Sequence, residues 1–250
     1  MSGRRPALVR PTRPGLGVRA KRLTRHVFLL MGSFRERPAR YYGLREGGES
    51  LHVVGVGCVL SCDGPMPRLF TALEIPTAIG QSLSMLRGGL PGARWIDPGN
   101  YHITLRFIGD VDVTVAHDVA SILDRVSRGS FELRLDGVSS FGGRKPRAVV
   151  ANVAPSQALM DLQAEHERLM QRVGLPPEGR KYTPHVTLAR LRDSSSRQVA
   201  DYLGERGSFR SAPFRAERFV LYSSRDSVGG GPYVVEADYP LETVQAKRAI

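Results

Sequence analysis

The chain has 250 residues, which is enough to bury a substantial core in one large domain or two modest ones. Hydrophobic residues make up 41% of the chain and no run of 18 apolar residues occurs, so the composition argues against a disordered chain and predicts no membrane span. The net charge of +12 is compatible with a polyanionic partner. The two cysteines, Cys58 and Cys62, are too few for a disulfide framework, so we expect a cytoplasmic protein in a reducing compartment.

The basic charge is concentrated in residues 1–65. This segment contains eleven Arg and one Lys against four acidic residues, whereas the rest of the chain contains 24 basic and 20 acidic residues. It has neither the period of a strand nor that of a helix, and Pro and Gly interrupt it. Three interpretations remain: a basic arm for nucleic acid, an Arg-rich targeting peptide, or sequence upstream of a true start at Met66. We expect a disordered extension over 1–65 and one folded domain over 66–245.

Regular strand and helix patterns begin after Met66. Apolar residues alternate in the predicted strands and recur at helical spacing in the predicted helices, with Pro at helix starts and Gly at helix ends. The first half contains, in order, a strand at 68–75, a helix from Pro76 to about 87, strands at 93–96 and 101–108 around a DPGN turn, and a helix over 115–126.

The second half continues the same interleaving. It contains a half-buried strand at 131–141 (FELRLDGVSSF), a strand at 147–154, a helix over 159–173, a strand at 185–191, a short helix around 195–205, and strands near 216–224 and at 233–241. Interleaved strands and helices with hairpin-like neighbours predict an α+β fold. Two lobes, each with one histidine-bearing strand, would explain why one motif occurs twice.

That motif is a histidine and a threonine two residues apart in an apolar strand. It occurs as YHITLRFIG (101–109) and again as PHVTLARLR (184–192). Residues i and i+2 of a strand point to the same face, so His102 projects with Thr104, and His185 projects with Thr187. If the two strands lie side by side, two imidazoles and two hydroxyls converge on one site.

Two imidazoles and two hydroxyls suit the hydrolysis of a phosphodiester. One ring can take a proton from water and the other can protonate the departing alkoxide, because imidazole titrates near neutral pH. The hydroxyls can hold the phosphate oxygens as negative charge develops on them. The sequence does not establish which histidine is the acid and which is the base.

A zinc site is the main chemical alternative, but two histidines need a further ligand. The other candidates, His117 and His166, fall in predicted helices beside core positions, and no HExxH motif occurs. We therefore expect no metal and no other cofactor. A P-loop is also unsupported, because the glycine clusters lack the following Lys and Ser or Thr.

The paired HITL and HVTL motifs resemble those of the two-histidine (2H) phosphoesterase superfamily. Together with RLFTALEIP, KYTPHVTLAR and LYSSRDSVGGGPYVVEADYPL, they are similar to its RNA 2′,3′-cyclic phosphodiesterase branch, also called 2′–5′ RNA ligase. The resemblance covers about 66–241. It implies a pseudo-symmetric, two-lobed fold with antiparallel sheets lining a central cleft and helices outside. It also implies a metal-independent enzyme that opens RNA 2′,3′-cyclic phosphate ends to 2′-phosphates.

The resemblance also implies roles for single residues. His102 would protonate the leaving 3′ oxygen, His185 would activate water as the proton acceptor, and Thr104 and Thr187 would hold the phosphate. Arg190 would bind near the phosphate or be a solvated strand-end arginine. Phe70 would stack on the terminal base or pack in the core. Further basic residues that could contact RNA phosphates are Arg144, Lys145, Arg147, Arg180 and Lys181.

Several functional alternatives remain open at this point. The substrate could instead be a small cyclic nucleotide or a 2′–5′ linked oligonucleotide, and the reverse reaction could join RNA ends as a minor activity. A non-catalytic RNA-end-binding protein would keep the fold without turnover, but it has no need for two proton-transfer groups. A structural protein leaves the paired motifs unexplained. We expect a monomer, since no coiled-coil pattern occurs.

Overall fold

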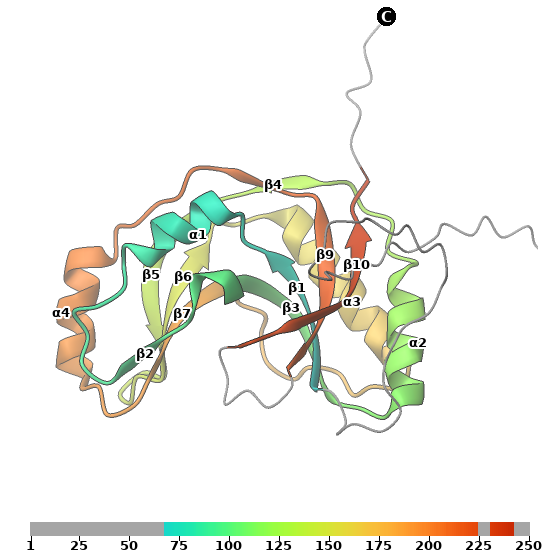
Figure 1. The fold of residues 1–250 in the computed structure, drawn as a ribbon, viewed down its shortest axis with the longest axis horizontal. Coiled ribbons are helices and arrows are strands. Elements are labelled where there is room, and N and C mark those ends of the chain that lie inside the picture. Colours follow the sequence, from blue (N-terminus) through green and yellow to red (C-terminus); the bar gives the residue numbers. More distant parts are fainter. Residues whose placement is uncertain (1–67, 225–230, 243–250) are drawn as a thin grey trace, which may run out of the picture. The chain divides into compact units, whose positions relative to one another are not determined.

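Figure 1 shows the computed structural model, which describes residues 68–224 and 231–242. The described residues all belong to one compact unit. The basic extension expected over 1–65, the alternative start and both cysteines lie outside the described residues, as do both ends of the domain expected over 66–245. None of the helices in the described part is both long enough and apolar enough to cross a membrane.

Strands and helices alternate along the chain, as the sequence predicts. The strands are β1 (Arg68–Glu74), β2 (Ala93–Trp95), β3 (His102–Asp110), β4 (Phe131–Leu133), β5 (Leu135–Phe141), β6 (Ala148–Val153), β7 (His185–Leu191), β8 (Phe214–Ala216), β9 (Arg218–Ser224) and β10 (Val234–Pro240). The helices are α1 (Thr77–Ser84), α2 (Val113–Leu123), α3 (Gln157–Arg172) and α4 (Ser196–Arg206), with a short 3₁₀ helix η1 at Pro98–Asn100.

The main sheet is antiparallel and has the strand order β10-β9-β1-β3-β7-β6-β5, with β2 also paired to β7. Its two halves meet where β3 and β7 pair through one residue pair, Ile103 with Val186. We call the half containing β1, β3, β9 and β10 the first lobe and the half containing β2, β5, β6 and β7 the second lobe (Figure 1). The two histidine motifs therefore lie on the strands at which the lobes join.

One helix, α3, crosses between the lobes. Helix α3 follows β6 of the second lobe but packs on β3 of the first, while α1 follows β1 and contacts η1. Leu162 on α3 is fully buried with Ile103 and Val186 in one core that includes residues of both lobes. Each such side chain contributes about 1.5–3 kcal/mol on burial, so the junction is stabilised mainly by packing beneath the sheet.

Three local predictions need correction. Residues 131–141 form two strands rather than one, because the chain changes partner at Arg134: Leu133 pairs with Phe214 of β8, while Leu135 pairs with Val153 of β6. The strand predicted near 216–224 is preceded by the separate strand β8. The DPGN segment is a 3₁₀ helix rather than a simple turn, with the Asp97 carboxylate accepting a hydrogen bond from the Gly99 amide at 2.8 Å.

Candidate active site

Strands β3 and β7 have the same burial pattern over their first six residues. In each, the histidine and threonine are half-buried, the residues between and after them are buried, and the sixth residue is exposed. His102 and Thr104 thus share one face of β3, and His185 and Thr187 share one face of β7, as the alternation predicts. We call this side of the sheet the motif face.

Both motif strands contain a β-bulge at the leucine of the motif. On β3, the partners of Ala72 and Thr71 are Thr104 and Arg106, so Leu105 is skipped. On β7, the partners of Val150 and Val149 of β6 are Thr187 and Ala189, so Leu188 is skipped. Each bulge turns two consecutive residues to the buried side and returns the next one, five positions after the histidine, to the motif face.

The antiparallel pair of Ile103 and Val186 brings the two motifs together. Because the strands are antiparallel at this pair, His102 lies across from Thr187, and Thr104 lies across from His185. The two rings are near enough for a positive charge on His185 to lower the pKa of His102. The four side chains therefore form a pseudo-two-fold set around one pair of strand residues.

Each histidine is oriented by a backbone carbonyl two residues earlier. Nδ1 of His102 lies 2.8 Å from the Asn100 oxygen, and Nδ1 of His185 lies 2.7 Å from the Thr183 oxygen. A carbonyl only accepts hydrogen bonds, so Nδ1 is the protonated nitrogen and donates in both rings. This leaves Nε2 of both rings to exchange protons with a substrate.

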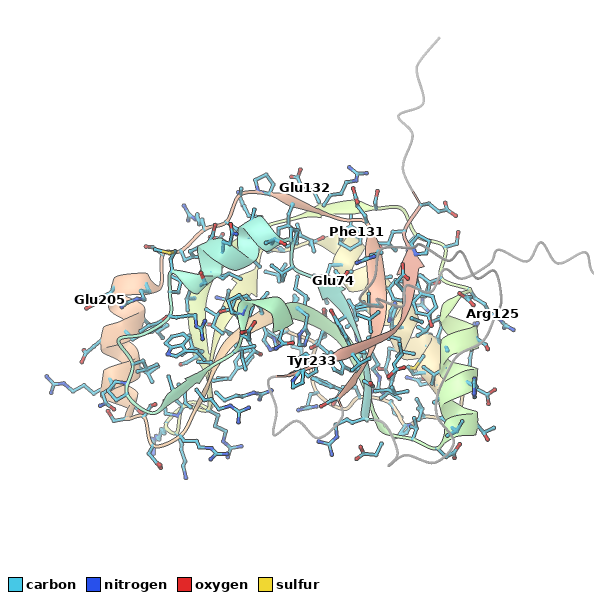
Figure 2. The ribbon with its side chains drawn as sticks, in the orientation of Figure 1. Glu74, Arg125, Phe131, Glu132, Glu205 and Tyr233 are labelled. Carbon is cyan, nitrogen blue, oxygen red and sulfur yellow. The ribbon has the colours of Figure 1, made fainter. Side chains whose placement is uncertain are left out.

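Aromatic rings surround His102. Its ring centroid lies 5.1 Å from that of Phe70 and 5.2 Å from that of Tyr233, which meets it edge-on and is labelled in Figure 2. The second motif has a similar neighbour, since Phe141 meets His185 edge-on at 4.8 Å. These rings remove water from both imidazoles.

Burial lowers the pKa of both histidines. It is the largest cause for His102, whose pKa falls to about 4, and the charges of His185 and Arg190 lower it further. Burial and then Arg190 also lower the pKa of His185. Arg190 is exposed on β7 at the position that follows the bulge, so this cation acts on both rings from the motif face.

The structure favours the packing role for Phe70. Its side chain is 3% exposed and is enclosed by Phe107, Tyr222 and Tyr233, so a nucleobase cannot lie on it in this conformation. The exposed ring of this cluster is Phe107, with 49% exposure. Sequence reasoning missed Phe107, although it lies five residues after its histidine, the same offset that relates Arg190 to His185.

Tyr182 was also missed, and it links the two motifs. Its hydroxyl donates to the Thr104 backbone oxygen at 3.0 Å, although Tyr182 lies just before the second motif and Thr104 belongs to the first. Burial raises the pKa of this phenol, so it stays protonated and remains a donor at neutral pH. No local pattern in the sequence indicates a contact between residues so far apart.

The other predicted candidates lie away from the four motif residues. His166 is fully buried on α3, where its Nδ1 lies 2.9 Å from Thr71 Oγ1 and burial lowers its pKa to about 3. His117 is exposed on α2. Arg180 pairs with Glu178 at 2.9 Å. Over residues 68–224 and 231–242, no three His, Cys, Asp or Glu side chains form a group that could hold a metal ion.

A family comparison agrees with this geometry. The model of the 2′-5′ RNA ligase superfamily matches residues 89–227, which include both histidine motifs. The chain belongs to this superfamily. Among curated relatives, an RNA 2′,3′-cyclic phosphodiesterase of Aeropyrum pernix is 30% identical over 148 residues, 55% of this chain and 82% of that protein. The protein of the same name from Thermotoga maritima is 28% identical over 179 residues, 67% of this chain and 92% of that protein.

Solved structures of similar proteins support the fold of this superfamily member. The protein TT0787 of Thermus thermophilus is 22% identical with a TM-score of 0.60, and the match covers 71% of this chain and all of that one. The E. coli LigT structure complexed with 3′-AMP is 24% identical with a TM-score of 0.58, covering 70% of this chain and 98% of that one. The two-lobed α+β fold expected from the resemblance is confirmed.

Proposed function

We propose that the protein hydrolyses RNA 2′,3′-cyclic phosphate ends to 2′-phosphates by two-histidine acid–base catalysis without a metal. The observation that supports this best is the matched orientation of the two imidazoles: each donates Nδ1–H to a backbone carbonyl and leaves Nε2 on the motif face. One Nε2 can then take a proton from water while the other gives one to the leaving oxygen. The curated relatives named as RNA 2′,3′-cyclic phosphodiesterases support the choice of substrate.

In this mechanism His102 protonates the leaving 3′ oxygen and His185 accepts the proton of the attacking water. Thr104, Thr187 and Arg190 bind the non-bridging phosphate oxygens, where negative charge develops in the transition state. Phe107 takes the stacking role first expected for Phe70, because its ring is exposed and packs against Phe70, which in turn contacts His102. We further propose a monomer in the cytoplasm, with 2′–5′ ligation as a minor reverse reaction.

The order of the histidine pKa values bears on these roles. In the free protein His102 is the more difficult ring to protonate, since burial and two cations lower its pKa to about 4. That order favours His185 as the donor, opposite to the role implied by the resemblance. We retain His102 as the donor, the role that the resemblance implies. In this role His102 lies beside the bound anionic phosphate, whose negative charge would raise the pKa of its ring.

The first experiment incubates the full chain with an RNA ending in 2′,3′-cyclic phosphate, in the presence of EDTA. We expect complete conversion to the 2′-phosphate, because both proton transfers and the binding of phosphate use side chains of the protein. The product is identified by its resistance to an enzyme that removes only 3′-phosphates. A 3′-phosphate product, or turnover that EDTA abolishes, would refute the mechanism, and binding without turnover would favour the RNA-end-binding alternative.

The lowered pKa values predict an acid-shifted pH profile. The active form has one protonated and one neutral ring, and it is most populated between the two pKa values of the pair. Both histidine pKa values lie below the ordinary value of about 6.5. Above about pH 6.5, kcat/KM is therefore expected to fall about tenfold for each pH unit. Arg190→Gln removes a cation that lowers both values, and should shift the profile to higher pH while lowering its maximum.

The control for this profile is Arg172→Gln, which removes an exposed cation at the end of α3. It should leave both the maximum and the position of the profile unchanged. An Arg190→Gln profile that keeps the position of the unmodified protein would show that Arg190 does not act on the histidines.

A further inference from the structure

One edge of the second lobe carries six exposed basic residues. They come from β2, from the β5–β6 loop and from the end of β7, and they comprise Arg94, Arg144, Lys145, Arg147, Arg190 and Arg192. The same three segments, 92–97, 142–147 and 190–193, contain two acidic residues, Asp97 and Asp193. Blue-tipped side chains gather at this end of the lobe in Figure 2. We call these six residues the basic edge.

Strand register places part of the basic edge next to the candidate site. Arg94 of β2 is the direct partner of Arg190 of β7, so the two side chains are neighbours on the motif face. Arg192 is exposed and directly follows Leu191, the last residue of β7, so the row of cations extends past the end of the strand, away from the histidines. The row begins at the cation that lowers the pKa of both rings.

The loop at the far end of the row is held in place. A Cβ on Gly142, at φ +110°, would lie 2.3 Å from the Lys145 carbonyl oxygen, so the tight turn requires glycine. The carbonyl of Arg144 accepts a hydrogen bond from Ser196 Oγ at the start of α4, at 2.8 Å. The loop cations are therefore positioned by the backbone before any ligand arrives.

Two exposed arginines of the first lobe are held in ion pairs. Arg68 pairs with Asp110 at 3.1 Å, and Arg218 pairs with Glu74 at 2.6 Å, so these cations are neutralised by neighbouring carboxylates. On the second lobe, Arg94 and Arg190 lie directly opposite each other on neighbouring strands, so one phosphate group can contact both. The exposed row of cations on the second lobe gives a polyanion a path away from the site.

We infer that the basic edge binds the phosphates of the RNA chain upstream of the reacting end. This inference rests on the proposed function and narrows its substrate class: the protein acts on the end of an RNA strand in preference to a cyclic mononucleotide. The strand leaves the histidines over β7 and β2 toward the β5–β6 loop. Binding of this kind is insensitive to base sequence and weakens with salt.

The test compares a roughly ten-nucleotide RNA bearing a 2′,3′-cyclic phosphate with the cyclic mononucleotide of the same terminal base. The variants are Arg94→Gln/Arg192→Gln and Arg144→Gln/Lys145→Gln, with Arg125→Gln/Arg172→Gln as a matched control. Arg125 lies in the turn after α2 and is labelled in Figure 2, and Arg172 is the last residue of α3. All six replaced side chains are exposed, and circular dichroism checks that each variant folds.

We expect each basic-edge variant to lower kcat/KM for the RNA about tenfold at low salt, since an exposed ionic contact contributes about 0.2–1 kcal/mol. The slope of log(kcat/KM) against log[salt] should become shallower by about 1.4, or 0.7 for each lost phosphate contact. Turnover of the mononucleotide and all values for the control variant should be unchanged.

Equal losses for the RNA and the mononucleotide, or an unchanged salt slope, would overturn the inference. Failure of the proposed function itself looks different, because neither substrate would be turned over by the unmodified protein. In that case fluorescence anisotropy with the same RNA separates the two ideas. Binding that the basic-edge variants weaken and the control does not would keep the basic edge as an RNA site, and binding unaffected by either would reject it.

Discussion

Replacing either motif histidine by alanine is expected to lower kcat/KM for RNA 2′,3′-cyclic phosphate ends by about 10²–10⁴-fold, the range measured for general acids and bases. Each ring supplies one of two proton transfers. The other histidine is needed for the second transfer, and the motif threonines have no group that could replace the missing Nε2. The double variant should be little worse than either single variant, because residues that act as a unit are not additive. Initial rates with a labelled RNA end measure the effect.

A substrate with a better leaving group separates the two roles. Nitrophenolate departs without a proton, so a 4-nitrophenyl phosphodiester needs the base but not the acid. If His102 is the donor, His102→Ala should lose far less activity on this substrate than on RNA, whereas His185→Ala should lose as much on both. The reverse pattern would assign the donor role to His185, in agreement with the pKa order of the free protein. His117→Ala, at an exposed histidine of α2, is the control and should match the unmodified protein.

Arg106→Ala is expected to lower the free energy of unfolding by about 3–5 kcal/mol, because it removes a buried cation and leaves the half-buried carboxylate of Glu167 without its ion pair. The guanidinium of Arg106 is 2.6 Å from Glu167 of α3, and the two side chains are 8% and 19% exposed. It also donates to the carbonyls of Phe107 and Pro176. These contacts tie the bulge of β3 to α3 and to the loop that leads to His185.

Thermal unfolding measures this loss, which corresponds to a decrease of roughly 6–20 °C in Tm for a domain of this size. Arg168→Ala is the matched control, since Arg168 is an exposed arginine of α3 and should shift Tm by about 2 °C or less. A Tm for Arg106→Ala within that range of the unmodified protein would show that the ion pair is not stabilising. At temperatures where Arg106→Ala stays folded, its pH profile should keep the position of the unmodified protein, because Arg106 is not among the causes of the histidine pKa shifts.

Strand alternation was sufficient to predict which motif side chains share one face of a strand. His102, Thr104, His185 and Thr187 form two pairs, each two residues apart on one strand, and a period of two fixes the common face of each pair whatever the rest of the fold does. The same rule fails one step further along. It would turn Arg106 to the face of His102 and Thr104, but the bulge at Leu105 sends it to the buried side.

The contacts that complete the site could not be predicted, because they join segments far apart in the chain. Phe141 and Tyr233 pack on the two histidines from β5 and from the residues before β10, and Tyr182 reaches the backbone of Thr104. Partner changes also leave no trace in a hydrophobic pattern. The alternation of residues 131–141 continues through Arg134, although the chain moves there from one sheet to another.

The twin bulges make the motif strands unequally tolerant of changes in length. Loss of Leu105 would turn the bulge into a regular ladder in which Thr104, Arg106 and later residues keep their partners and their faces, at the cost of one buried side chain. Loss of Leu188 would likewise leave Arg190 on the motif face. Loss of Ile103 would instead place Thr104 on the face opposite His102. Single-residue deletions should therefore be survivable at the two bulged leucines and destroy the site one or two positions earlier.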